Sequence, residues 1–422
     1  MNVKLKWDLI YLTANALIGR FLGYGRDWLI LKYFGLGSSA DNLLWYIAFV
    51  ELFTTLFSPQ TIYPVSSKSF YNRLNERQKI KSAVSLFNFL AYACILSISL
   101  IMCIFGNSNA NMDYIFCAGA AIFNVKHYMM LLALQHLKIF KPSSLNNIFI
   151  NTNIIISIVG ELCMPGSFSL MMAVTHFTRY ICFHRINNRI YRLLNRGNYT
   201  SNFKYNTFDW KYNLLSRYLA FFIVGLIPIS DKLILSLGKT GYLSGYIICE
   251  RIFLLPISII LSPAINRLIP IFQLILKDQI RFEQTKPSNN ILIKIFALII
   301  ILNCGLYASS AYVSEAILWF GNESSISKVE LTKIYNKLML GFLPYITSVI
   351  TTTVAFSCLE SRFIYYHTLG IVLFKSITYY VCHFVHTSPL YLINYNNLLY
   401  CLATVNIALF VIKKTQIKKI CA

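Results

Sequence analysis

Long apolar stretches recur along almost the whole length of this 422-residue sequence. A helix that crosses the hydrocarbon core of a bilayer needs about 20 mainly apolar residues. About a dozen stretches meet that requirement: residues 8–34, 41–65, 82–105, 113–137, 143–162, 166–184, 213–237, 241–275, 290–312, 334–359, 362–384 and 391–412. Only 13% of the residues are charged, too few to cover the surface of a soluble protein of this size. The sequence therefore predicts an all-α polytopic membrane protein with about 12 transmembrane helices.

Basic residues collect in alternate loops between these stretches. The formal net charge is +22, and lysine and arginine accumulate on the cytoplasmic side of membrane proteins. The even-numbered loops and both chain ends hold these residues, whereas odd-numbered loops such as 35–40 and 106–112 lack them. This alternation predicts an even helix count with both termini in the cytoplasm. No soluble basic domain is expected, so nucleic acid is not an expected partner.

The longest basic linker divides the chain into two halves. We expect an N-terminal six-helix lobe over residues 1–190, a cytoplasmic linker over 191–212 and a C-terminal six-helix lobe over 213–422. Transporters built from two such halves bind their substrate at a central site between them. The predicted architecture is two six-helix lobes around a central cationic cavity.

The sequence offers little for a metal, a cofactor or an enzyme reaction. The eleven cysteines fall singly and form no C-x-x-C pair. Catalytic motifs such as H-E-x-x-H and G-x-S-x-G do not occur in a suitable context. We therefore expect a transporter without a catalytic residue, a metal site or a cofactor.

Ionisable residues nevertheless lie inside the predicted spans, where a charged side chain costs on the order of 3 kcal/mol at the membrane centre. Such a residue persists when it faces a wet cavity or a partner, so it is a functional candidate. Asp27, Lys32 and Asp41 also have plainer interpretations, as a balance for nearby arginines or as interfacial residues. The full set is Arg20, Arg26, Asp27, Lys32, Asp41, Glu51, Lys126, Asp231, Lys232, Glu250, Arg251 and Lys375.

Three arginines of this set favour an anionic substrate. Arginine keeps its charge, and its planar fork suits two-point binding of phosphate. Several cations in a lipid-surrounded cavity point to a diphosphate group. Arg20, Arg26 and Arg251 are the predicted ligands, with Asp41 and Lys126 as further substrate-binding candidates.

Residues 19–45 read GRFLGYGRDWLILKYFGLGSSADNLLW. This stretch resembles the opening of the bacterial lipid II flippase family, which belongs to the multidrug/oligosaccharidyl-lipid/polysaccharide (MOP) superfamily. The shared pattern is an R-x-L-G-x-x-R-D core, an F-G-x-G turn and a following aspartate, here Asp41. A second match is the acidic–arginine pair Glu250–Arg251 followed by Pro256, with Pro270 near a later proline of the family.

The resemblance implies a two-lobed bacterial inner-membrane protein that binds the diphosphate of an undecaprenyl-linked sugar. Arg20, Arg26 and Arg251 would match the cavity arginines of the family, and Asp41 its acidic residue at the start of the second helix. The family has an arginine pair in that helix, where this chain has Thr54 and Thr55, and usually has fourteen helices. The shorter length fits the O-antigen and capsule flippases of the same superfamily.

The expected function is alternating-access transport of an undecaprenyl-diphosphate-linked oligosaccharide, an O-antigen or capsule repeat unit, from the cytoplasmic to the periplasmic leaflet. The alternatives are a lipid II flippase, a multidrug exporter and a membrane polysaccharide polymerase. Expected partners are the lipid-linked glycan, the bilayer and other polysaccharide-assembly proteins, and the chain is expected to be a monomer. Transport would be coupled to Na⁺, H⁺ or membrane potential. Glu250 and Asp231 are the coupling or gating candidates, and Lys375 is a built-in cation for the same place.

Overall fold

The computed structural model describes residues 3–57, 76–105, 111–136, 141–195, 231–232, 235, 239–256, 297, 300–321, 325–348, 361–384 and 389–421. These residues are helical apart from short turns, and no β-strand occurs among them. Most of the predicted linker 191–212, and Pro270 in the predicted eighth span, lie outside these ranges. The chain divides into two compact units. Unit 1 comprises Met1–Tyr33 and Asn42–Ile229, and unit 2 comprises Phe34–Asp41 and Ser230–Ala422.

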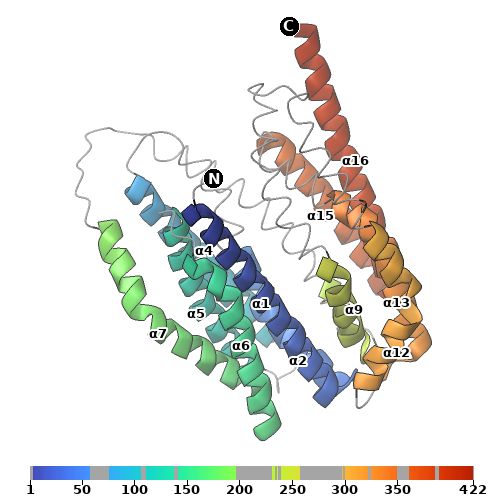
Figure 1. Cartoon of the computed structure of the whole chain (residues 1–422), viewed down its shortest axis with the longest axis horizontal. Coiled ribbons are helices and arrows are strands. Elements are labelled where there is room, and N and C mark those ends of the chain that lie inside the picture. The colour runs from blue at the N-terminus through green and yellow to red at the C-terminus, as the bar shows by residue number, and fades with distance from the viewer. Residues whose placement is uncertain are drawn as a thin grey trace. The chain divides into compact units, whose positions relative to one another are not determined.

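The described part of unit 1 is a bundle of long helices. In chain order they are α1 (Val3–Phe34), α2 (Ser38–Leu56), α4 (Glu76–Phe105), α5 (Asn111–His136), α6 (Lys141–Cys163) and α7 (Phe168–Asn195). Helix α5 packs along α4 and α7, and α7 also packs against α6 (Figure 1). Each of the first six predicted stretches overlaps one of these helices, because an uninterrupted apolar run of this length favours a continuous helix.

Two helical segments of the described chain are by themselves long and apolar enough to cross a membrane, Met112–Leu134 and Leu145–Cys163. Both belong to unit 1, in α5 and α6. A third apolar helical segment, Val84–Leu100 in α4, is shorter. The total of about 12 spans and the six-helix lobes therefore stay predictions.

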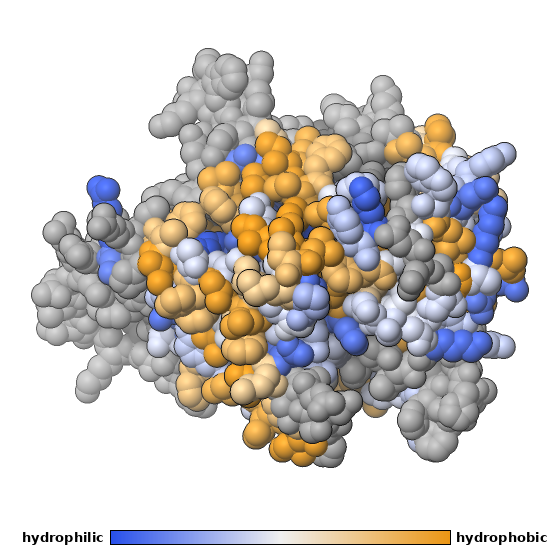
Figure 2. All heavy atoms as spheres, turned by 90° about the horizontal axis from the view of Figure 1, so that it is seen from below, coloured by the Kyte–Doolittle hydropathy of each residue, from blue (hydrophilic) through white to orange (hydrophobic). Residues whose placement is uncertain are grey.

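Helix α7 is amphipathic in the sense opposite to that of a helix in a water-soluble protein. Its inner face is at most 5% exposed and carries the polar residues Ser169, His176 and Arg179 beside Met172. Its outer face is between 43% and 52% exposed and is apolar: Leu170, Val174, Phe177 and Ile181. Figure 2 likewise shows apolar side chains gathered over broad areas of one face of the molecule. This arrangement suits a surface in contact with lipid, with polar groups turned into the bundle.

Close packing of α1 on α6 depends on a glycine in the matched sequence motif. A Cβ atom at Gly19 would lie 3.0 Å from the Cβ of Asn147 and 3.3 Å from the backbone nitrogen of Ile148. The carbonyl oxygen of Gly19 accepts a hydrogen bond from Asn151 Nδ2 at 2.7 Å. The missing side chain thus lets the two backbones approach, and Asn151 fixes their register.

The described helices of unit 2 are α9 (Tyr242–Pro256), α12 (Ser310–Phe320), α13 (Lys328–Leu340), α15 (Ser361–Phe384) and α16 (Pro389–Cys421). Helix α13 packs against α9, α12 and α16, and α15 packs against α16 (Figure 1). Helix α13 begins six residues before the predicted stretch 334–359. Ser327 and Glu330 form a capping box there, which satisfies the first backbone N–H groups and starts the helix within polar sequence.

Candidate functional site

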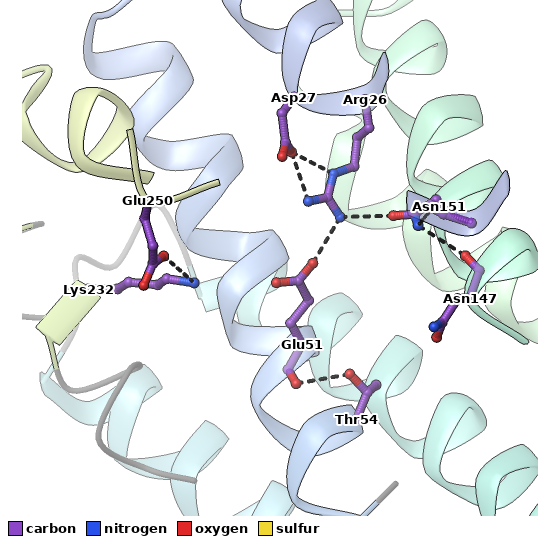
Figure 3. A network of polar contacts seen from close by, with 9 residues as sticks. Arg26, Asp27, Glu51, Thr54, Asn147, Asn151, Lys232 and Glu250 are labelled. Carbon is purple, nitrogen blue, oxygen red and sulfur yellow. Dashed lines mark hydrogen bonds and ion pairs between the residues drawn. The ribbon is translucent and has the colours of Figure 1, made fainter. Parts of the chain in front are cut away.

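Arg26 lies inside unit 1, where it is bound by two carboxylates and an amide (Figure 3). Its Nε and Nη2 atoms lie 2.8 and 2.7 Å from Oδ1 of Asp27. Its Nη1 atom donates to Oε1 of Glu51 at 2.8 Å and to Oδ1 of Asn151 at 3.3 Å. The Arg26 side chain is only 2% exposed, whereas that of Glu51 is 27% exposed. Asp27 therefore balances a neighbouring arginine.

This geometry bears directly on the predicted role of Arg26 as a diphosphate ligand. Both sides of its guanidinium fork are occupied by carboxylates of the protein, and charge-assisted bonds of this kind are strong. A phosphate could reach Nη1 only if Glu51 withdrew. In the arrangement described here, Arg26 positions α2 and α6 around α1, and its contact with substrate stays a prediction.

Arg20 and Lys126 are the other cationic candidates of unit 1. Arg20 lies on α1, nearly two turns before Arg26, and is half-buried. Lys126 lies on α5, and its Nζ atom is 4.8 Å from the ring centroid of Tyr180 on α7, a cation–π contact. Neither residue is among those labelled in Figure 3.

Asp41 is placed in unit 2, where it caps the start of α9. Its Oδ2 accepts the backbone N–H of Gly241 at 2.6 Å, and its Oδ1 accepts that of Ser244 at 2.8 Å. A carboxylate at a helix N-terminus satisfies free donors and complements the helix dipole. Gly241 has φ of +87°, and a Cβ atom there would lie 2.7 Å from the carbonyl oxygen of Leu36. Both oxygens of Asp41 thus serve the fold, and its role in substrate binding stays a prediction.

In the acidic–arginine pair of α9, Glu250 lies close to a lysine. Glu250 Oε2 lies 3.8 Å from Nζ of Lys232, with side chains 16% and 10% exposed (Figure 3). Arg251 follows on the next position of the helix, points in a different direction and is half-buried. The charge of Glu250 is thus opposed by that of Lys232, another residue of unit 2.

Asp231 and Lys375 form a buried ion pair in unit 2. Lys375 Nζ lies 2.7 Å from Oδ1 of Asp231, and both side chains are 4% exposed. Asn396 Nδ2 donates to Oδ2 of Asp231 at 2.9 Å, and the Tyr379 hydroxyl donates to Oδ1 at 3.1 Å. Lys375 also donates to Oδ1 of Asn396. The carboxylate is therefore surrounded by donors, one of which is a fixed cation.

Sequence reasoning missed Arg179, which is buried on α7 in unit 1. It is 5% exposed, and its Nη2 donates to Oδ1 of Asn124 on α5. The signal that could have revealed it is an arginine three residues after His176 within an apolar stretch. That spacing places both residues on one helical face.

The described residues include no group of three or more His, Cys, Asp or Glu side chains that could hold a metal ion. Several ionisable groups are instead arranged as cation–carboxylate pairs, namely Arg26 with Asp27 and Glu51, and Lys375 with Asp231.

Solved structures with a similar fold are membrane transporters. The lipid II flippase MurJ, in an inward closed conformation, is 15% identical over 96% of this chain and 87% of its own, with a TM-score of 0.70. A MOP superfamily transporter from Pyrococcus furiosus is 11% identical over 97% of this chain and 96% of its own, with a TM-score of 0.65. The MATE transporter VcmN from Vibrio cholerae is 11% identical over 98% and 97%, with a TM-score of 0.63.

No protein-family model matches the sequence, and no curated protein matches it significantly. The likeness to solved structures nevertheless covers nearly the whole chain. The chain has the fold of the MOP transporters. The all-α fold predicted from the apolar stretches, and the resemblance to the MOP superfamily seen at residues 19–45, are thereby confirmed.

Proposed function

We propose that this chain is a flippase that moves an undecaprenyl-diphosphate-linked oligosaccharide, an O-antigen or capsule repeat unit, across the bacterial inner membrane. The observation that carries the proposal is the fold, which the chain shares with the lipid II flippase MurJ over 96% of its length. The sequence motif around Arg20 and the pair Glu250–Arg251 support the same assignment. The chain would lie in the membrane with both termini in the cytoplasm.

In this proposal the diphosphate is bound by arginines contributed by both halves of the chain. Arg20 in unit 1 and Arg251 in unit 2 are half-buried and lie on helices that carry the matched motifs. Arg26 would join them only after Glu51 released its Nη1 atom. The prenyl tail would remain in lipid while the two halves alternate between inward and outward openings.

A lipid II flippase is the second candidate function. Against it stands Thr54, which is 5% exposed and whose hydroxyl donates to the carbonyl oxygen of Glu51. A neutral, internally bonded side chain cannot supply the positive charge that the lipid II flippase family places in this helix. A multidrug exporter is the third candidate, since the MATE transporter VcmN shares the fold. Exporters of cationic drugs favour cavities lined by acidic residues, whereas the predicted ligands here are arginines, which repel cations.

The test is transport by the purified full chain in proteoliposomes. Vesicles that contain a fluorescent undecaprenyl-diphosphate oligosaccharide should show transfer between leaflets, and Arg20→Ala or Arg251→Ala should reduce the rate at least tenfold. Lys328→Ala is the matched control, because Lys328 is an exposed cation paired with Glu315. Full transport by both arginine variants would remove these residues from the site. Transfer of lipid II alone would favour the second candidate.

We also propose that Lys375 replaces a coupling cation at Asp231. A lysine ammonium 2.7 Å from the carboxylate occupies the place that a bound Na⁺ would need. Transport should then proceed equally in sodium and in choline buffers. A sodium requirement would contradict this part of the proposal, as would full activity of Asp231→Asn, while leaving the substrate assignment intact.

A further inference from the structure

A second cationic cluster lies inside unit 1, between α5 and α7. We define it as Arg179 and His176 on α7 with Asn124 and His127 on α5. Each of these residues is at most 5% exposed, and α5 and α7 pack along one another. None of them belongs to the motifs matched above or to the Arg26 network.

Arg179 has more hydrogen-bond donors than the described chain satisfies. Its Nη2 donates to Oδ1 of Asn124. Its Nε and Nη1 atoms have no hydrogen-bond partner among the described residues, and neither does Nδ2 of Asn124. An amide NH₂ and a guanidinium can only donate. The cluster therefore presents several buried N–H groups from two facing helices.

The charge of Arg179 is also not balanced within the described part of unit 1. Arginine cannot lose its proton, and a buried cation without a counter-charge is strongly unfavourable. The carboxylates of this unit whose side chains are described bind other groups. They are Asp27 and Glu51 on Arg26, Asp113 on Tyr46 and Ser169, and Glu161 on the backbone N–H groups of Gly166 and Phe168.

We propose that the Arg179 cluster binds a small monovalent anion such as chloride. A water molecule would satisfy the N–H groups but would leave the charge of Arg179 without compensation. An anion supplies both the acceptor and the counter-charge. Asn124 and His176 are fully buried, which favours a single-atom halide over a bulky phosphate ester.

A hydrogen bond to the backbone fixes which nitrogen of the His176 ring carries the proton. Its Nδ1 lies 2.8 Å from the carbonyl oxygen of Met172, and a carbonyl can only accept, so Nδ1 carries a proton. The ring is thereby oriented, and Nε2 is the remaining atom without a partner among the described residues. Arg179 and Asn124, rather than His176, are the principal anion ligands in this arrangement.

The test uses purified full-length protein in detergent. Thermal unfolding is followed in sodium chloride, sodium bromide and sodium gluconate at equal ionic strength, and binding of ³⁶Cl⁻ is measured directly. A ligand that binds the folded state raises the Tm in a saturable manner. Both halides should raise the Tm relative to gluconate, and one ³⁶Cl⁻ should bind per chain. Equal Tm values with no bound ³⁶Cl⁻ would overturn the proposal.

Two variants locate the site. Arg179→Gln should abolish ³⁶Cl⁻ binding. Because that variant could fail to fold, Asn124→Asp is the stronger test, since it places a carboxylate at the atom that already accepts from Arg179. It should lose halide binding and unfold in gluconate at a temperature at least as high as the wild-type protein. Arg189→Gln, an exposed arginine on the same helix, should keep the halide effect. Retained halide binding in Asn124→Asp would overturn the proposal.

Discussion

The Nζ atom of Lys375 lies 2.7 Å from Oδ1 of Asp231, and the two residues stand 144 positions apart in the sequence. Both side chains are almost completely buried, and Asn396 and Tyr379 complete the hydrogen bonding of the carboxylate. A buried pair of this kind links the region around Asp231 to α15 and α16. Its value to the protein depends on both charges being present together.

Removal of one member of this pair should therefore be more harmful than removal of both. Lys375→Met or Asp231→Asn alone leaves an uncompensated buried charge and should destabilise the folded state by about 3–5 kcal/mol. The double variant should recover a large part of that loss. Thermal unfolding of the four proteins in detergent gives the double-mutant cycle. Additive effects of the two substitutions would show that the ion pair does not couple them.

Neither glutamine nor lysine should replace Arg26 without a loss of folding stability. Arg26→Gln removes the cation from the buried Asp27 and the partly buried Glu51, with an expected loss of about 3–5 kcal/mol. Arg26→Lys should not restore stability, because one ammonium cannot bridge both carboxylates and Asn151 as the fork does. The measurement is the Tm of each variant. Recovery of the Tm in the triple variant with Asp27→Asn and Glu51→Gln would confirm that the loss comes from stranded carboxylates.

Two glycines of α1 should respond differently to alanine. Gly19→Ala places a Cβ atom 3.0 Å from Asn147 and should cost about 1–3 kcal/mol through overpacking against α6. Gly25→Ala meets no atom within 4 Å and should be neutral or should stabilise the helix by up to about 1 kcal/mol. Tm values of the two variants test this contrast. A greater loss at Gly25 would contradict the packing of α1 described here.

The start of α13 should make stability depend on pH through Glu330. The Tyr242 hydroxyl donates to this carboxylate at 3.0 Å, which lowers the pKa of Glu330 below its ordinary value of about 4.3. A lowered folded-state pKa gives stability that is complete above the unfolded-state pKa and is lost as the pH falls through the folded-state pKa. Tyr242→Phe should therefore weaken the acid dependence of the Tm. An unchanged profile between about pH 3 and 6 would contradict this role.

The same helix start offers a simpler comparison. Ser327→Ala removes the side chain that accepts the backbone N–H of Glu330 and should cost about 1 kcal/mol. Thr332→Ala is a suitable control, because its exposed hydroxyl bonds only within the helix to the carbonyl oxygen of Lys328. The difference in Tm between the two variants measures the cap. Equal losses would indicate that Ser327 does not limit the start of α13.

Much of the helical framework was predictable, because the length of an apolar run is a local property of the sequence. The beginning of α13 was missed, because Glu330 and Lys333 resemble loop residues until Ser327 is recognised as a cap. The capping box is also local, so a search for Ser-x-x-Glu would have found it.

The candidate site was predictable only in part. The sequence marked Arg26, Asp231 and Lys375 as charges within the spans, and it suggested that Lys375 could take the place of a cation at Asp231. It could not assign Glu51 and Asn151 to Arg26, because they lie 25 and 125 positions away and the rotation of each helix decides the contact. Arg179 was missed because its significance comes from what surrounds it, namely Asn124 and the two histidines.

Asp41 supplies the cap of a helix that is synthesised 200 positions later. The first turn of α2, which carries Asp41, leaves the ribosome before α9 exists, so the carboxylate is made before the helix that it caps. A second half produced alone from residue 213 would lack Asp41. The backbone N–H groups of Gly241 and Ser244 at the start of α9 would then lose the carboxylate that accepts them. The second half of the chain is therefore not an independent folding unit. When it is expressed separately, α9 should form fully only if a segment that contains residues 34–41 is added.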